Sequence, residues 1–254
     1  MAMRTPTVVI TGATGAIGSA TAAALTRRGA HVVALSRPEV DLSSMASVRA
    51  AARALNREGG HIDALLNIAA IFSPRYQKTV DGFELMLATN HLGPFLLTNL
   101  LRDRLLRGGR VINVTAPSST PVDLDRLLDR DRFGAMHSFG ASKAANLMFT
   151  FELARRAKRW DARANAFHPG LVRSNLMAEA PRPVRVITRL ISRAPDQAAQ
   201  DLTELALSPA FAGTTGWFFK RTRQVVPPKP VQDVAAQGLL WRRSAELVEL
   251  EGGF

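Results

Sequence analysis

The chain has 254 residues and no cysteine, which excludes disulfide bonds, thiolate metal ligands and thiol nucleophiles. It also lacks an uninterrupted run of about 18 apolar residues, the length that spans a bilayer. Residues 1–6 contain no apolar stretch typical of a signal peptide. A hydrophobic fraction of 46% is enough for a large core and excludes intrinsic disorder. We therefore expect a soluble, cytoplasmic protein that does not bind a membrane.

Lysine is scarce, because only five of the 33 basic residues are lysines. Against 21 acidic residues the formal net charge is +12. The arginines are spread over nearly every segment of helical character, whereas nucleic-acid binding requires a clustered basic surface. We therefore expect no nucleic-acid partner. Most arginines are expected on solvated helix faces, although the same charge would attract a phosphorylated cofactor or an acidic substrate.

Apolar β-branched runs alternate with segments of helical periodicity along the chain. The expected strands are residues 7–11, 31–36, 64–68, 110–114, 163–167 and 215–219. The expected helices are residues 16–28, 43–57, 81–106, 138–158, 196–207 and 231–249. Alternation of this kind predicts an α/β fold, a doubly wound parallel sheet with helices on both faces. No linker-like stretch divides the chain, so residues 1–254 are expected to form a single domain.

A glycine-rich loop, TGATGAIG at residues 11–18, joins the first expected strand to the first expected helix. Glycines at its three positions allow a tight turn, a close approach of backbone to a pyrophosphate, and close packing of the helix. The helix N-terminus then offers unpaired N–H groups to the phosphates. The loop predicts a Rossmann-like dinucleotide site to which these residues contribute: Gly12, Thr14, Gly15, Ala16, Ile17 and Gly18.

Further motifs follow in a fixed order: NIAA at 67–70, DGFE at 81–84, TNHLGPFLLTNLL at 89–101 and HPGLVRS at 168–174. Together with the glycine loop they resemble the short-chain dehydrogenase/reductase family over nearly the whole chain. The segments 81–84 and 89–101 are similar to its retinol-dehydrogenase-like branch. The resemblance implies a nicotinamide-dependent oxidoreductase. It also implies that the following residues bind the cofactor: Asn67, Ala69, Lys143, Pro169, Gly170, Leu171 and Val172.

The residues after the second expected strand indicate which dinucleotide is bound. An acidic side chain there accepts from the ribose of NAD, whereas arginine pairs with the 2′-phosphate of NADP. This chain has Ser36-Arg37, which favours NADPH, although Arg37 could be one more surface arginine. Only three residues separate Arg37 from Asp41-Leu42, the pair that borders the adenine in the family. A parallel crossover needs about a dozen residues, so we expect a sheet short of one edge strand and a more open adenine pocket.

The catalytic residues of the family are matched only in part. The resemblance implies a carbonyl-polarising serine, a proton-donating tyrosine, a lysine four residues later and an asparagine. Asn90 and Lys143 occupy the last two positions, but Ala116 replaces the serine and Phe139 the tyrosine. Tyr76, the one tyrosine of the chain, lies outside that position. A positioned general acid typically contributes ~10²–10⁴ of rate, so the family's ordinary mechanism is not available.

Two nearby residues are candidate replacements. Ser118 is our candidate for polarising a carbonyl, although Ser118-Ser119-Thr120-Pro121 is first of all a turn sequence. His137 has a suitable pKa for an acid, but its place at a helix start favours a surface or capping role. His91 and His168 are expected to be structural. No spacing of His, Asp and Glu suggests a metal site.

Residues 175–195 stand where the family has a variable substrate lid. Val184, Ile187 and Ile191 form an apolar helical face. Arg185, Arg189 and Arg193 repeat on the other face, which favours a solvated stripe but would also suit an acidic substrate or a membrane surface. Met86, Met177 and Trp217 make a bulky, flat, apolar substrate plausible. The run 220–223 is expected to be a solvated turn.

The sequence leaves two main functions open. One is an NADPH-dependent ketoreductase acting on a phenolic or quinoid, polyketide-type substrate that supplies its own proton, as in atypical ketoreductases of angucyclinone pathways that the chain resembles. The other is a non-redox protein, namely a nucleotide sensor or a cyclase or isomerase, that retains the dinucleotide site. The protein is expected to be a monomer, or a homodimer paired through residues 81–106 and 138–158.

Overall fold

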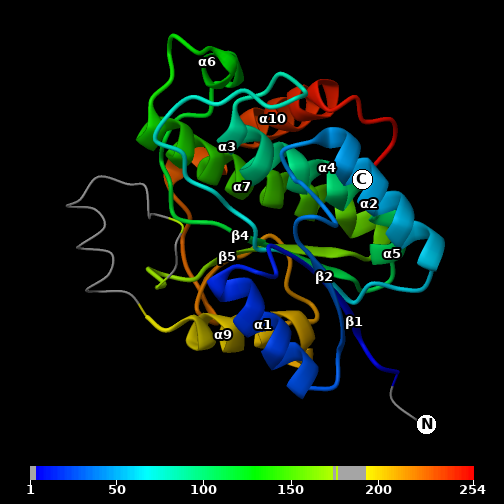
Figure 1. Ribbon diagram of the computed structural model, residues 1–254. Helices are drawn as coiled ribbons and strands as arrows, with labels where there is room; N and C mark the ends of the chain where they lie inside the picture. The colour runs from blue at the N-terminus through cyan, green and yellow to red at the C-terminus, as the bar shows by residue number, and fades with distance from the viewer. Residues whose placement is uncertain (1–3, 174–175, 177–192) are drawn as a thin grey trace.

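A seven-stranded sheet forms the centre of the computed structural model, which describes residues 4–173, 176 and 193–254 (Figure 1). The strand order is β2-β1-β3-β4-β5-β6-β7. The first six strands are parallel and β7 runs antiparallel to β6. The strands are β1 (Thr7–Thr11), β2 (His31–Leu35), β3 (Ala64–Asn67), β4 (Arg110–Val114), β5 (Arg163–His168), β6 (Phe218–Lys220) and β7 (Arg223–Gln224).

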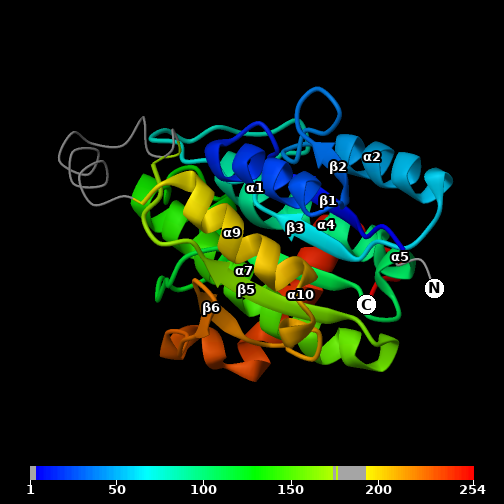
Figure 2. The same cartoon turned by 90° about the horizontal axis from the view of Figure 1, so that it is seen from below.

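Two helical layers enclose the sheet, so the expected doubly wound α/β fold is confirmed. Helices α1 (Ala16–Arg27) and α9 (Pro195–Leu207) cover one face, which is nearest the viewer in Figure 2. Helices α2 (Met45–Glu58), α4 (Gly93–Leu100) and α7 (Ala135–Ala157) cover the other. Because side chains alternate along a strand, Val8 and Ile10 pack with the first pair and Val9 with the second group.

The expected loss of an edge strand is also confirmed. β2 lies at the end of the sheet and, within the described part of the chain, pairs only with β1. Residues 36–44 then lead to α2, whose first turn is capped by Ser44 Oγ accepting from Ser47 N. The segment is too short for a further helix and strand. β7, by contrast, was not expected: the turn at 220–223 closes a hairpin, with Arg221 at φ +58°.

The helix expected over residues 81–106 is divided. It consists of α3 (Leu85–Leu87), the π-helical segment η1 (Ala88–Leu92), α4 and α5 (Arg102–Leu105). The helical region begins at Leu85, four residues later than expected, because the Glu84 carboxylate caps it by accepting from Met86 N and Leu87 N. Pro94 has no N–H to give to the Asn90 carbonyl one turn back, and Asn146 Nδ2 takes that place at 2.7 Å.

The remaining helices have bounds that differ from expectation by a few residues. Helix α7 begins at Ala135 rather than 138, and the C-terminal helix α10 covers Val234–Leu247. The short elements are α6 (Leu124–Leu128), η2 (Lys158–Trp160), η3 (Pro209–Phe211) and η4 (Lys229–Gln232). Helix α6 was not expected; Asp123 caps it by accepting from Arg126 N. No helix of the described residues is both long and apolar enough to cross a membrane.

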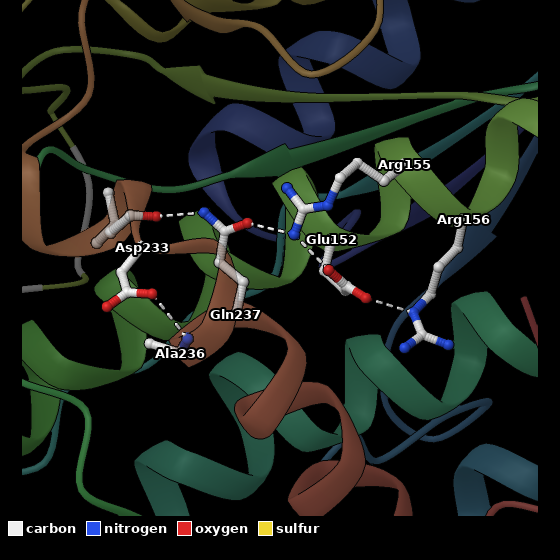
Figure 3. A network of polar contacts seen from close by, with 7 residues as sticks. Glu152, Arg155, Arg156, Asp233, Ala236 and Gln237 are labelled. Carbon is white, nitrogen blue, oxygen red and sulfur yellow. Dashed lines mark hydrogen bonds and ion pairs between the residues drawn. The ribbon is translucent and has the colours of Figure 1, made fainter.

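Helix α10 packs on the outer side of α7 and α4. The Trp241 ring lies 5.0 Å from Phe95 and 5.8 Å from Phe149, between ring centroids. Polar contacts add to this packing (Figure 3): Gln237 accepts from Arg155 at 2.6 Å, and Glu152 pairs with Arg155 and with its neighbour Arg156. The C-terminal residues also pack against α4, where Phe254 N donates to Asn99 Oδ1. Thus the faces considered above for dimerisation are covered by the chain itself.

Candidate active site

The glycine loop lies at the carboxyl end of β1 and is folded tightly. Gly12 has φ +71°, and a Cβ there would lie 2.8 Å from the Ala69 Cα. A Cβ on Gly18 would lie only 2.1 Å from the Gly12 carbonyl oxygen. Gly15 N donates to that same oxygen at 3.0 Å. Both close approaches exclude any larger residue, as the sequence motif requires.

The N-terminus of α1 fits a pyrophosphate. Its N-cap, Gly15, supplies no side-chain hydrogen bond, and the first turn contains no acidic residue. The backbone N–H groups of Ala16, Ile17 and Gly18 therefore have no partner within the helix. Together with the helix dipole they form a cationic end that suits a phosphate group.

The end of β2 is bound to the glycine loop. Ser36 Oγ accepts from Thr14 N at 3.1 Å, which brings the two predicted cofactor segments together. Arg37 is exposed beside them. Burial raises the pKa of Asp41, but hydrogen bonds from Ser43 and the charge of Arg37 outweigh it and lower the pKa overall. Leu42 is only 5% exposed and belongs to the core, and its carbonyl lies against Gly93.

Two more predicted segments lie at the same edge of the sheet. Asn67 at the end of β3 is buried and donates to Asn113 Oδ1 and Thr98 Oγ1, at 2.8 and 3.1 Å. The segment Pro169–Val172 follows β5, with Gly170 at φ +77°. Ligands of open α/β sheets bind at the carboxyl ends of the strands, where all these segments meet.

Arg193 fixes the segment after β5. The Arg193 guanidinium donates to the Pro169 carbonyl, and the backbone N–H of Arg193 donates to the Leu171 carbonyl at 2.7 Å. It also pairs with Asp201 of α9 at 2.8 Å, with both side chains less than one-fifth exposed. The expectation that Arg193 belongs to a solvated stripe is therefore wrong. Its partners in that pattern (Val184, Arg185, Ile187, Arg189 and Ile191), Met177 and nearly all of the expected lid lie outside the described residues.

Lys143 and Phe139 lie one turn apart on α7, at the positions where the family resemblance implies catalytic residues, and we call this place the catalytic corner. The Lys143 Nζ lies 5.3 Å from the centre of the Phe139 ring. The lysine is only 5% exposed, and this burial lowers its pKa to about 8. Phe139 meets Phe72 edge to face, with centroids 5.6 Å apart. A cation at this point can hold hydroxyl or phosphate oxygens of a ligand, whereas Phe139 can give no proton.

The Asn90 side chain holds the loop after β3 against α7. Its Oδ1 accepts from Ile71 N at 2.8 Å, and its Nδ2 donates to the Ile71 carbonyl and to Ser142 Oγ, each at 3.0 Å. Both amide hydrogens are thereby used. Asn90 is therefore placed to position the corner. π-Helical turns occur frequently at functional sites, and η1 contains this residue.

The hydroxyl groups near Ala116 are bound to carbonyls of α7. Ser118 donates to the Gly140 carbonyl at 2.8 Å, and Thr115 donates to the Lys143 carbonyl at 2.8 Å. Gly140 is required here, since a Cβ would lie 2.4 Å from Thr120 Oγ1. The 115–120 loop is thus fastened beside Phe139. The Ser118 hydroxyl hydrogen is used in its bond to the Gly140 carbonyl, so Ser118 can donate to a substrate only after its hydroxyl rotates away from Gly140.

The three histidines near these segments differ in burial. His91 is fully buried, bonds Ser244 Oγ through Nε2 at 2.9 Å, and has its pKa lowered to about 4 by burial. It is therefore neutral at pH 7, in agreement with the expected structural role. Burial also lowers the pKa of His168 and of half-buried His137, with Arg126 adding to the effect on His137. Among the described residues, no group of three His, Asp or Glu side chains could hold a metal.

Sequence reasoning missed a buried polar row on α7. Ser142, Asn146 and Thr150 follow one another every four residues and therefore share one helix face. Thr150 accepts from Asn113 Nδ2 at 2.9 Å, and Asn146 donates to the Asn90 carbonyl. The row links the ends of β3 and β4 to the catalytic corner. A polar residue at every fourth position of an apolar helix was the signal that could have revealed it.

The residues suggested for the substrate side separate in the structure. Met86 is fully buried and packs with Phe72 close to Phe139. Trp217 instead packs on Phe219, with centroids 5.6 Å apart, and does not belong to the Phe72 group. Met86 and Trp217 thus do not belong to one cluster, and a contact of Trp217 with a substrate stays a prediction.

Comparison with known proteins places this geometry in a family. A family model described as short chain dehydrogenase matches residues 38–184. Human retinol dehydrogenase 14 is 33% identical, with 98% of this chain and 88% of the relative covered. DnrU of Streptomyces sp. (strain C5), a proposed daunorubicin C-13 ketoreductase, is 35% identical, with 95% and 92% covered. The chain belongs to the short-chain dehydrogenase/reductase family of oxidoreductases, and its likeness to the retinol-dehydrogenase branch is confirmed.

Solved structures agree with this assignment. An uncharacterised protein from Mycobacterium paratuberculosis superposes with a TM-score of 0.80 and 31% identity, covering 98% of this chain and 95% of that one. A 3-alpha-hydroxysteroid dehydrogenase from Pseudomonas sp. B-0831, solved with NADH, gives a TM-score of 0.71 at 22% identity, with 84% and 94% covered. The second likeness shows the shared fold.

Proposed function

We propose that the protein is an NADPH-dependent ketoreductase that reduces a carbonyl of a bulky aromatic, phenolic substrate of polyketide type. One observation carries the proposal. Lys143 occupies the position of the family's lysine, and beside it Phe139 stands where the family resemblance places the proton donor. The relative DnrU, described as a ketoreductase of daunorubicin, supports the substrate class. The proton is proposed to come from a phenol of the substrate beside the reacting carbonyl.

Each segment at the carboxyl edge of the sheet would bind a different part of the cofactor. The N-terminus of α1 would hold the pyrophosphate, and Arg37 would pair with the 2′-phosphate, which favours NADPH over NADH. Asp41 would border the adenine, and Lys143 would hold the nicotinamide ribose. The segment Pro169–Val172 would contact the nicotinamide. When bound, the cofactor supplies a hydride.

The residues of the corner would orient the substrate and keep water away. Phe139 and Phe72 give the reacting carbonyl an apolar surrounding, in which an internal hydrogen bond from phenol to carbonyl is stronger than in water. The proton released by such a phenol leaves a phenolate, a far more stable anion than an alkoxide. Asn90 would keep the loop after β3 in place, and Ser118 remains the residue proposed to polarise the carbonyl.

The direct test follows NADPH oxidation with phenolic quinones and with simple ketones of similar size. We expect turnover of the phenolic compounds and a rate at least about 100-fold lower for ketones without the phenol, the scale of a lost general acid. Tight NADPH binding without turnover of any substrate would instead favour the non-redox alternative. A Phe139→Tyr variant separates the ketoreductase from the non-redox alternative further. Under the ketoreductase proposal, the wild type reduces the phenolic substrate without this tyrosine.

Arg37 is tested by its neutral variant. Arg37→Ala should weaken NADPH binding about tenfold or more and leave NADH binding nearly unchanged, because a charge-assisted pair contributes ~1.5–3 kcal/mol. Arg27→Ala removes an exposed arginine from the last turn of α1 and is the matched control. Equal losses in both variants would show only a general effect of charge.

A further inference from the structure

A third hydrophobic cluster, separate from the two cores, includes the Phe139 ring. Phe72 and Met86 are buried at its centre. The partly buried residues packed against them are Ile71, Phe133, Ala135, Phe139 and Leu176. The whole cluster contains three phenylalanines, and Phe139 meets Phe72 edge to face. We call Phe72, Phe133 and Phe139 the aromatic wall; it starts at the catalytic corner.

The wall extends outward to Tyr76. The Tyr76 and Phe133 rings meet edge to face, with centroids 5.7 Å apart and an angle of 84°. The Tyr76 hydroxyl donates a weak hydrogen bond, 3.4 Å long, to the Leu128 carbonyl of α6. In Figure 1, α6 and the segment before α3 lie together above the N-terminal part of α7. Tyr76 therefore connects the wall to a surface formed by α6.

This surface contains a groove of about 520 Å³, lined by Tyr76, Lys78, Leu128, Asp129 and Arg130. We call it the cationic groove. Its volume lies within the ~300–1,000 Å³ of small-molecule sites. Two of its side chains are cations and one is an anion, and the Asp129 carboxylate already accepts from Asp131 N at 2.9 Å. Among the described residues, no ion pair involves Lys78 or Arg130.

We propose that the cationic groove is a substrate subsite that binds an anionic extension of the ligand, while the flat aromatic part lies along the aromatic wall. The inference rests on the proposed function and adds a substrate class to it. That class is a polycyclic phenolic ketone with a carboxylate or another ionised oxygen acid at the end remote from the reacting carbonyl. Aromatic side chains favour flat rings. The Lys78 and Arg130 charges attract an anion; together they exceed the single negative charge of Asp129 in the groove, and neither forms an ion pair with it.

The test compares two ligands that share the aromatic ketone and differ only in the acidic extension. Their binding is measured by calorimetry in the presence of NADP. Lys78→Gln/Arg130→Gln removes both charges of the groove. Arg223→Gln/Lys229→Gln removes two exposed charges on β7 and η4 and is the matched control. All four positions are exposed, so circular dichroism and thermal melting should show intact folds.

We expect the wild type to bind the acidic ligand about three- to tenfold more tightly, because exposed charge pairs contribute little each. The groove variant should lose this preference, and the control should keep it. Affinity for the ligand without the acid should change less than about twofold throughout. The preference should also shrink as ionic strength rises from about 0.05 to about 0.5 M.

Equal binding of the two ligands by the wild type would overturn the subsite, as would an equal loss in the control variant. The outcome for the subsite is separable from the outcome for the proposed function. Preferential binding without reduction of either ligand would refute the ketoreductase and support the subsite. Reduction of both ligands without any preference would do the reverse.

Discussion

The Lys143 Nζ faces the ring of Phe139 across 5.3 Å, one helical turn away on α7. An ammonium group over an aromatic face is attracted to the ring, but the phenylalanine cannot pass a proton on. We therefore propose that the buried lysine serves as a cation for a ligand, since its neighbour Phe139 offers no acid to activate. This relationship distinguishes the site from the tyrosine–lysine pair that the family resemblance implies.

Lys143 should make NADPH binding depend on pH. Burial lowers its pKa to about 8, so the ammonium is present below that pH and is lost above it. We expect the NADPH dissociation constant to rise between about pH 7 and about pH 9.5, as the charge disappears. Lys143→Met should bind weakly with no such pH dependence. Fluorescence titration of NADPH at several pH values measures both, and a flat wild-type profile would contradict the assignment.

Lys143 should also lower the free energy of unfolding of the ligand-free protein. Its pKa is lowered in the folded state, so the unfolded chain binds more protons and stability rises with pH between about 8 and 10.5. Lys143→Met removes the buried charge and should raise the free energy of unfolding at pH 7 by about 1–3 kcal/mol. Urea unfolding measures this. A less stable Lys143→Met protein at pH 7 would show that the charge is well compensated.

The glycine loop should tolerate no side chain at its closest contact. A Cβ at Gly18 would lie 2.1 Å from the Gly12 carbonyl oxygen, a backbone atom that cannot move aside as a flexible side chain could. We expect Gly18→Ala to lose NADPH binding and to be destabilised by about 1–3 kcal/mol through overpacking. Gly213→Ala is the control, since nothing lies within 4 Å of a Cβ there. Thermal melts and NADPH titration compare the two, and equal behaviour would contradict the clash.

Asn90 should matter for stability because its side chain makes three hydrogen bonds in the interior. Asn90→Ala leaves the Ile71 backbone groups without partners, so we expect a loss of about 2–4 kcal/mol in the free energy of unfolding. Asn56→Ala removes one exposed hydrogen bond, to the Leu100 carbonyl, and should cost less than about 1 kcal/mol. Similar losses in the two variants would show that Asn90 does not anchor the loop.

Helix α10 should keep the protein monomeric. It covers α7 and α4, and Trp241 is only 6% exposed between them. We expect sedimentation equilibrium to give the mass of one chain, 27.5 kDa. Trp241→Ala should cost about 3–5 kcal/mol of stability and expose the apolar face, so that the variant self-associates. A stable wild-type dimer would contradict this prediction.

Much of the fold could be predicted from the sequence because local patterns carried it. The β-branched runs at 7–11 and 110–114 became β1 and β4 with the expected bounds. The short spacing between Arg37 and Asp41 predicted that β2 ends the sheet. The helix over 81–106 could not be bounded in this way, since its start depends on the Glu84 carboxylate and its interior on a bond from distant Asn146.

The candidate site was predictable where a motif names its residues and not where partners come from elsewhere in the chain. Ser36 and Thr14 were both expected near the cofactor, but only the structure bonds them to each other. Arg193 was assigned to a solvated face because its helical spacing is that of exposed arginines. Its actual partners, the Pro169 and Leu171 carbonyls and Asp201, lie before and after it along the chain.

By itself the amino-acid sequence determined the alternation of strands and helices and the glycine loop, because each is written in residue types at fixed spacing. It also placed Ala116 and Phe139 where the family resemblance implies a serine and a tyrosine. The tertiary structure alone decided that Phe139 joins an aromatic wall leading to a cationic groove and that α10 covers α7. Such contacts join residues far apart along the chain, and their formation depends on how whole elements pack, which no local pattern encodes.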